Sequence, residues 1–375
     1  MQPQGIYNLS VREEEGRSKR SRVGLLHERT GVPVFLIYLS DLDKPRTFEI
    51  FSAEEVETLG FKAANAPDKA AWKLLKSFFE SEGQHALVVA SPYSEKDPLG
   101  SLIGKDKGLT SRTGIHTLRG VVEYADLVVV PQASVLLDSK AHKLFYSRLF
   151  ELNTELDHFF ILVDFPKSFT LGEIKSWQKN MAHTNAALYY PWLLVDTSLL
   201  PPGPVAAAAY QRNDAQYGIQ DSPANRALPP QASPVRALSP ADLSEFNNHN
   251  VNVFHSLEEK DLRIWGGYTL TDRLDFDNKH IATRRTILAL KEAVHSLCEP
   301  FVLEPMVSDL AHTIDVSLHS FFQDHKKLLD GSQRQAFKTE VRVITEGGDD
   351  VVQVDLQISL PYVVNQMTLS MALTG

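Results

Sequence analysis

Residues 159–195 read FFILVDFPKSFTLGEIKSWQKNMAHTNAALYYPWLLV. The stretch opens with a continuous apolar run, Phe159–Val163, that ends just before Asp164. A segment with helical spacing follows, in which Ile174 and Trp177 share one face, and a second apolar run covers residues 187–195. Apolar strands separated by a helix are typical of a parallel or mixed sheet with helices on both faces. This stretch therefore predicts an α/β fold.

The same alternation extends toward the N-terminus. Strongly apolar runs predict further buried strands, and segments with apolar residues at helical spacing predict further helices. The expected strands cover 34–38, 86–90 and 125–131, and the expected helices cover 70–79 and 139–152. We therefore expect an α/β domain over residues 23–200, preceded by a polar and charged N-terminal arm, residues 1–22.

Prolines are dense between Pro201 and Pro240. Proline lacks a backbone donor and cannot lie inside a helix or a central strand, which argues against a sheet interior and against a long helix here. Tyr210, Tyr217 and Leu228 are apolar anchors that a free linker would not need. We expect an ordered, extended crossover into a second domain, residues 201–350.

The second domain is expected to be α+β. Helices are predicted at 284–297 and 307–329, and short strands at 252–254, 262–266 and 340–344. From Val351 the chain alternates between apolar and polar residues, which predicts a strand arm over 351–375. The apolar positions of that arm are Val352, Val354, Leu356, Ile358 and Leu360. The fold class is thus mixed α/β, with an extended arm at each end.

Composition excludes several classes of protein. The chain has 375 residues, a formal net charge of −9 at pH 7 and one cysteine, Cys298. One cysteine excludes an intramolecular disulfide framework and a multi-cysteine zinc site. The acidic balance argues against nucleic-acid binding, and no segment is long enough to span a membrane. The N-terminus lacks the pattern of a signal peptide, which favours assembly in a cytoplasm.

A search for catalytic motifs finds little. The segment Gly100–Asp106 is one residue too short for a phosphate loop, and Asp106 would repel phosphate. The thirteen histidines show no ligand spacing and are expected at the surface or at helix caps. Asp164 is the best catalytic candidate, because ligands bind at strand carboxyl ends in open α/β sheets. Its alternative role is a turn or helix-cap aspartate. We expect no catalytic site, metal or cofactor.

The middle and C-terminal parts of the chain contain an ordered series of motifs. These are Tyr190-Pro191-Trp192, Pro202-Gly203, Arg212, Asp214, Pro223, Asn225, Asn252, Trp265-Gly266, Arg284-Arg285 and Glu304-Pro305. Each motif alone is unspecific, but their order and spacing resemble the contractile tail sheath protein family. That family serves contractile phage tails, phage-tail-like bacteriocins and extracellular contractile injection systems. Met306 and Leu310 depart from the family pattern, which leaves open a divergent, baseplate-proximal paralogue.

The resemblance implies a structural protein that is not an enzyme. Sheath subunits stack as hexameric rings around an inner tube, and the sheath shortens to drive the tube through a target envelope without consuming nucleotide. The implied partners are copies of the same chain, the inner tube protein, and baseplate and tail terminator proteins. Assembly would occur in the bacterial cytoplasm, as part of a virion tail or a released particle. The α/β domain would lie outside and the second domain inside, with the helix 307–329 as a candidate tube contact.

The resemblance also implies that both arms donate strands to neighbouring subunits, which is β-augmentation. The residues concerned are Gly5, Ile6, Tyr7, Leu9 and Val11 in the first arm and Val352, Val354, Leu356, Ile358 and Leu360 in the last. Two alternatives remain: a cap or baseplate-proximal paralogue that does not contract, and a soluble α/β enzyme with a ligand near Asp164.

Overall fold

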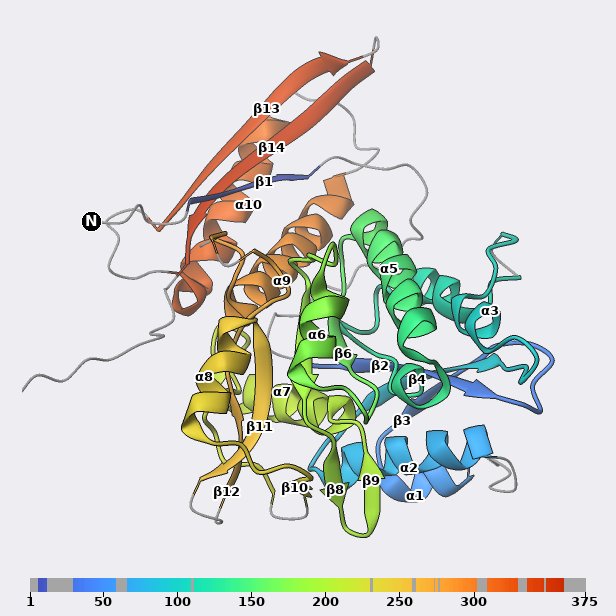
Figure 1. Ribbon diagram of the computed structural model, residues 1–375. Coiled ribbons are helices and arrows are strands. Elements are labelled where there is room, and N and C mark those ends of the chain that lie inside the picture. Colours follow the sequence, from blue (N-terminus) through green and yellow to red (C-terminus); the bar gives the residue numbers. More distant parts are fainter. Residues whose placement is uncertain are drawn as a thin grey trace, which may run out of the picture. The chain divides into compact units, whose positions relative to one another are not determined.

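Contacts divide the chain into two units (Figure 1). One spans Gly24–Glu292, and the other combines Met1–Val23 with Ala293–Gly375. The structure, a computed structural model, describes residues 6–11, 30–58, 66–108, 111–229, 232–257, 261–272, 274–275, 277–301, 309–329, 336–346 and 349–360. Gly5, Glu304, Pro305 and the end of the expected C-terminal arm, residues 361–375, lie outside the described residues.

An eight-stranded mixed sheet is the framework of the first unit, and its strand order is β12-β11-β7-β6-β5-β2-β4-β3. The six inner strands pair in parallel, whereas β12 and β3 pair antiparallel at the two edges. The strands are β2 (Pro33–Leu39), β3 (Arg46–Ile50), β4 (Ala86–Pro92), β5 (Leu127–Val129), β6 (Phe160–Asp164), β7 (Ala186–Tyr190), β11 (Val251–Leu257) and β12 (Asp261–Trp265).

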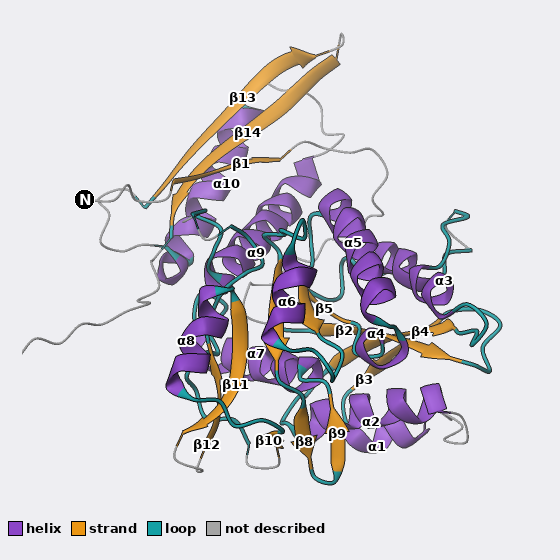
Figure 2. Cartoon of the chain, viewed as in Figure 1, coloured by secondary structure: helices purple, strands orange, loops and turns teal. Residues whose placement is uncertain are grey.

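Helices cover both faces of this sheet (Figure 2). In β2, Val34 and Leu36 point into one apolar cluster, and Phe35 and Ile37 point into the other. The first cluster includes side chains of α5 (Ser139–Leu156), α6 (Leu171–Gln178) and α8 (Pro240–Asn248). The second includes side chains of α2 (Ala66–Glu80), α7 (Gly203–Tyr217) and the start of α9 (Ile281–Cys298). The mixed α/β prediction is therefore confirmed.

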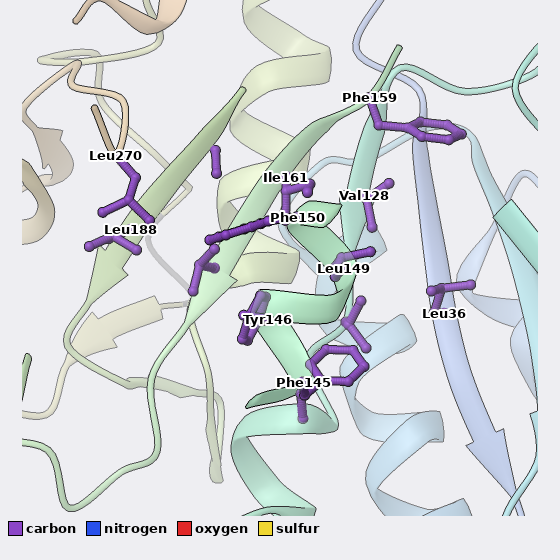
Figure 3. Packing of buried hydrophobic residues seen from close by; sticks show 14 of the residues in the cluster. Leu36, Val128, Phe145, Tyr146, Leu149, Phe150, Phe159, Ile161, Leu188 and Leu270 are labelled. Atoms are coloured by element: carbon purple, nitrogen blue, oxygen red, sulfur yellow. The ribbon is translucent and has the colours of Figure 1, made fainter. Parts of the chain in front are cut away.

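Figure 3 shows how the first cluster is filled. Phe145, Tyr146 and Leu149 of α5 lie against Val128 and Ile161 of the sheet, and all five are essentially unexposed. Full burial of a large apolar side chain contributes about 1.5–3 kcal/mol relative to its exposure. α5 begins directly after Asp138, whose side chain accepts a hydrogen bond from Ala141 N and caps the first turn.

Shorter elements complete the first unit. A small antiparallel sheet has the order β10-β8-β9. Its strands are β8 (Leu193–Val195), β9 (Ser198–Leu200) and β10 (Ala232–Pro234), and the remaining helices are α1 (Ala53–Thr58), α3 (Pro98–Ile103), α4 (Ala133–Leu136) and the 3-10 helix Gly114–Gly120. The single strand expected over 187–195 is wrong: β7 and β8 are separate strands in different sheets. Pro191, which has no donor for a ladder, lies between them.

The expectation that residues 201–240 exclude a long helix is also wrong. α7 runs for 15 residues from Gly203, and its residues 203–211 are nearly all buried. Pro201, Pro202 and Pro204 lie before or within the first turn, where the missing donor costs nothing. No proline interrupts the chain from there to Pro223. The prolines therefore mark where the helix starts, and the crossover is ordered but not extended.

The first unit continues well past residue 200. α7 packs on the sheet, and β11 and β12 extend it through the parallel pairing of β11 with β7. Contacts thus place residues 203–265 in the same unit as residues 30–200. The second unit contains β1 (Ile6–Val11), α10 (Leu310–Asp324), β13 (Phe337–Glu346), β14 (Asp349–Ser359) and the 3-10 helices Glu299–Phe301 and Lys326–Leu328.

Candidate assembly interface

A three-stranded antiparallel sheet brings the two ends of the chain together, in the order β1-β14-β13. β1 pairs with β14 from Ile6 opposite Ser359 to Val11 opposite Val354. On its other side β14 pairs with β13 along the length of both strands. β1 therefore covers one edge of β14, as Figure 1 shows, and β13 forms the other edge of this sheet.

One face of the sheet packs on α10. Val354, Leu356 and Ile358 are buried and alternate with more exposed residues, as the sequence pattern predicts for β14. Phe322 of α10 stacks on Phe337 of β13 with the ring centroids 5.1 Å apart. The apolar side of α10 consists of Leu310, Ile314, Leu318 and Phe322. Val352 is only half-buried, and Leu360 is buried just after the strand ends.

The opposite face of the sheet is polar. Arg342 of β13 forms an ion pair with Asp355 of β14, and Gln353 Nε2 donates to both carboxylate oxygens of Asp355 at 3.0 Å. These hydrogen bonds, from Gln353 first and then Arg342, lower the pKa of Asp355. The sheet thus has one apolar face with a partner helix and one charged face.

The residues predicted to exchange strands lie on this sheet. Ile6, Tyr7, Leu9 and Val11 are in β1, opposite Ser359, Ile358, Leu356 and Val354 of the same chain. These pairs lie within one chain, and exchange of the same strands between subunits stays a prediction. The structure shows the register in which β1 pairs with β14 of its own chain.

A buried ionic cluster anchors α9 in the first unit. Arg285 donates to Asp214 of α7 and also to Asp126, at 2.8 Å, just before β5. Asp126 in turn accepts from Gly31 N at 3.0 Å. The Arg285 guanidinium lies 4.8 Å from the centre of the Tyr210 ring. Burial raises the pKa of Asp214, and the adjacent Arg285 opposes that rise. These side chains tie α7, α9 and the sheet together.

No protein-family model matches the sequence, and no curated protein matches it. Among solved structures, a chain from the contracted baseplate of the anti-feeding prophage is 17% identical with a TM-score of 0.77, and the match covers 96% of this chain and 97% of that one. A chain from the contracted sheath complex of the extracellular contractile injection system PVC is 16% identical with a TM-score of 0.71, covering 97% and 98%.

The sheath tail protein of Desulfitobacterium hafniense is 9% identical with a TM-score of 0.56, and the match covers 92% of this chain and 100% of that one. The chain has the fold of a contractile tail sheath protein. The resemblance drawn from the motif series is thereby confirmed at the level of the fold. The three structures compared above are a baseplate, a sheath complex and a sheath tail protein.

In this sheath fold, several motif residues bond the backbone of neighbouring segments. Asn252 of β11 donates to Leu188 O and Tyr268 O and accepts from Tyr268 N. Gly266 has a φ of +125°, and a Cβ there would lie 2.8 Å from Asn252 Oδ1. Asn225 N donates to Ile264 O at 2.7 Å, which fixes the segment beside β12. These contacts explain two of the residue types in the motif series. The amide of Asn252 bonds the backbone of two segments, and the position of Gly266 has no room for a Cβ.

Other motif residues join elements by side-chain contacts. Tyr190 stacks on Phe246 of α8 with the ring centroids 4.7 Å apart. Trp192 Nε1 donates to Phe165 O at 2.7 Å. Arg284 donates to Asn185 Oδ1 and Asn278 Oδ1, and Arg212 donates to Glu82 Oε2 and Ala227 O. Pro202 precedes α7, Pro223 is buried, and Trp265 is 40% exposed at the end of β12.

Asp164 is a helix cap. Its Oδ1 accepts from Gly203 N, the first residue of α7, at 2.6 Å, and the side chain is fully buried. Burial raises the pKa of Asp164 to about 8. A shallow depression of about 340 Å³ lies near the other end of α7, lined by Arg212, Asn213, Tyr217, Arg226 and neighbouring residues, and Asp164 does not line it. The position therefore fits the structural role that we weighed against catalysis.

His142 departs from the expectation that histidines lie at the surface or at helix caps. It is fully buried in α5, and Trp177 Nε1 donates to its Nδ1 at 3.0 Å, which leaves Nε2–H to donate to Asp164 O at 2.8 Å. Burial lowers the pKa of His142 to about 3, so the ring stays neutral. Its position seven residues before Leu149 on the buried face of α5 was the available signal.

The described residues contain neither a metal-binding cluster nor a membrane-spanning helix. No group of three or more His, Cys, Asp or Glu side chains there is arranged to hold a metal ion. None of the described helices is long and apolar enough to cross a membrane.

Proposed function

We propose that this chain is a structural sheath subunit that polymerises as stacked hexameric rings around an inner tube and contracts to drive the tube through a target envelope. The observation that carries this proposal is the extent of the fold similarity, which covers 96% of this chain in the match to the contracted baseplate and 97% in the match to the contracted sheath complex. The similarity thus includes the large sheet and nearly the whole of the chain around it.

Strand exchange would link the subunits. In a polymer, the edge of β14 that β1 covers would receive the first arm of a neighbouring copy, in the register from Ile6 opposite Ser359 to Val11 opposite Val354. The outer edge of β13 offers ten residues of backbone to a second strand, for which the part of the C-terminal arm that follows β14, residues 361–375, is the candidate donor. Backbone hydrogen bonds each contribute about 1 kcal/mol net. Because the same strand pairing would recur between all neighbouring subunits, the sheath as a whole would be held together strongly.

The remaining assignments follow the sheath resemblance. Residues 23–200 would form the outer domain, residues 201–350 the inner domain, and residues 1–22 and 351–375 the linking arms. The inner tube would contact the outer face of α10, which includes His312, Gln323 and Val316, the last 53% exposed. The ends of the sheath would meet a baseplate and a tail terminator protein, after assembly in the bacterial cytoplasm into a virion tail or a released particle.

A second candidate function is a baseplate-proximal paralogue that does not itself contract. It is favoured by one observation, the TM-score of 0.77 to a chain from a baseplate. Such a protein would form single rings on a baseplate, whereas a main sheath protein would form long tubes. Electron microscopy of the purified protein distinguishes the two, and discrete small particles that turn over a metabolite would support the enzyme alternative instead.

Deletion of an arm tests strand exchange. We expect chains lacking residues 1–11, or lacking residues 361–375, to remain folded and monomeric, because the large sheet does not use either segment. A chain lacking residues 1–4, which precede β1, is the matched control and should form tubes. Long tubes seen by electron microscopy after either of the larger deletions would contradict the exchange mechanism.

A further inference from the structure

In the single chain, β1 occupies an edge of its own β14. Six residues, from Ile6 to Val11, pair in continuous register with residues 354–359. A long strand with an uncovered edge presents unpaired donors and acceptors and readily recruits another chain. The covered edge is the same one that strand exchange would use, so within one chain it is already filled.

The first arm is also long enough to fill the same edge on another copy. Residues 12–29 lie between β1 and the described part of the first unit. A segment of that length spans up to roughly 60 Å when extended. A folded chain of this size has a radius of gyration of about 21 Å, so a neighbour in contact lies within reach. The two occupancies make the same backbone bonds and differ only in which chain supplies the strand.

The two pairings make the same contacts but differ in the effective concentration of the strand. Inside one chain, residues 12–29 tether β1 near the slot, meaning the edge of β14 that β1 covers, at an effective concentration of the order of millimolar. The strand of a neighbour in dilute solution is at a much lower concentration and competes poorly. The strand of a neighbour fixed on a growing assembly is also tethered, so it can compete with β1 of the same chain. This is the balance that governs domain swapping, in which identical elements exchange between protomers.

We propose that pairing of β1 with its own β14 is an autoinhibitory contact that slows polymerisation of the free subunit. Assembly is then faster where a templating surface holds a subunit with this edge of β14 or this strand exposed, and each added subunit opens its own contact as it joins. This inference rests on the proposed strand exchange, and it adds a reason why free subunits would form sheath more slowly away from a template.

A reversible cross-link tests this contact directly. Asn8 lies opposite Gln357 in the register, and Gln357 is exposed. Both would be replaced by cysteine (N8C and Q357C) in a chain in which Cys298 is changed to serine. A matched control pairs N8C with Q353C, four residues out of register. Thiol titration and mass spectrometry report the bond, and circular dichroism checks folding.

We expect the in-register variant to form an intramolecular disulfide in dilute solution and to lose polymerisation when oxidised, by roughly tenfold or more in initial rate. Reduction should restore tubes, and the control should neither cross-link nor respond. Oxidised protein that polymerises as fast as reduced protein would overturn the inference, and so would a disulfide that forms only between chains. If reduced and wild-type chains never form tubes or rings, the proposed function fails instead.

Binding of an isolated strand gives a second measurement that does not depend on tubes. A fluorescent peptide of residues 1–11 should bind the chain that lacks those residues and should bind the full chain at least about tenfold more weakly, because the slot is filled. Equal binding to both chains would show that β1 does not close the slot. A peptide with the same residues in scrambled order is the control.

Discussion

Arg285 and Asp214 form a fully buried ion pair, with Arg285 Nη2 2.6 Å from Asp214 Oδ2 and Nη1 3.0 Å from Oδ1. The pair joins the start of α9 to α7, and neither side chain is more than 1% exposed. Removing one partner leaves a buried charge without compensation, which typically costs about 3–5 kcal/mol, whereas removing both can be nearly neutral. The cluster is therefore a sensitive point for the stability of the first unit.

The first prediction concerns this pair. Arg285→Met should lower the free energy of unfolding by about 3–5 kcal/mol, because it leaves the buried Asp214 carboxylate without its partner. The double variant Arg285→Met/Asp214→Leu should recover much of that loss, since Asp126, the carboxylate that also loses Arg285, is partly exposed and keeps its hydrogen bond from Gly31 N. Denaturant unfolding of the two single variants and the double variant measures the coupling. Additive losses in the double variant would show that the pair is not electrostatically linked.

The second prediction concerns Asp164, whose pKa of about 8 lies above its ordinary value because of burial. The unfolded chain releases this proton near pH 4 and the folded chain keeps it until about pH 8. This group's contribution to stability is therefore full below pH 4 and is lost as the pH rises to 8. Asp164→Asn should remove that loss while keeping an acceptor for Gly203 N. Unfolding free energies from pH 4 to 9 measure it, with the exposed Glu57→Gln as control.

The third prediction concerns the approach of α7 to Asp164. A Cβ on Gly203 would lie 2.4 Å from Asp164 Oδ2, so Gly203→Ala should destabilise the chain by about 1–3 kcal/mol through overpacking. Gly172, in the first turn of α6, has no atom closer than 3.8 Å to such a Cβ. Gly172→Ala should be neutral or stabilising by up to about 1 kcal/mol. Thermal unfolding of both variants provides the comparison, and equal effects would refute the steric argument.

The fourth prediction concerns the packing of α10 on the sheet formed by β1, β14 and β13. Phe322→Ala should cost about 3–5 kcal/mol locally, because Phe322 is fully buried against Phe337. Hydrogen exchange should then speed up in β13 and β14 more than in β6 and β7. Val316→Ala, on the exposed side of the same helix, should change stability by less than about 0.5 kcal/mol. Uniform loss of protection across both units would contradict this expectation.

The large sheet was predictable because its strands are apolar on both faces, as in Phe159–Val163, and runs this short and this apolar are typical of buried parallel strands. α7 was missed because proline density was judged over the whole of 201–240, although the prolines gather at the start of the helix and beyond Pro223. Asp126 was missed because an aspartate before a strand carries no sign of a partner 159 residues away. Long-range ion pairs need the fold before they can be recognised.

The pairing between the ends of the chain marks the limit of sequence-based inference at the candidate interface. Alternation in residues 352–360 predicted β14, and the short alternating run at 6–11 suggested a strand. Nothing in either pattern specifies that Tyr7 lies opposite Ile358, because register depends on the partner that is present. Whether the partner comes from the same chain depends on the length of the tether and on the concentration of neighbours.

β14 is longer than the strand that covers it. β14 begins at Asp349, whereas β1, among the described residues, reaches only from Ser359 back to Val354. If strand exchange occurs as proposed, the remaining stretch would serve as a toehold, as in the displacement of one nucleic-acid strand by another. An incoming arm that docks there would advance by branch migration, replacing one backbone pair at a time, so the edge of β14 would pass from one strand to the other without being fully uncovered.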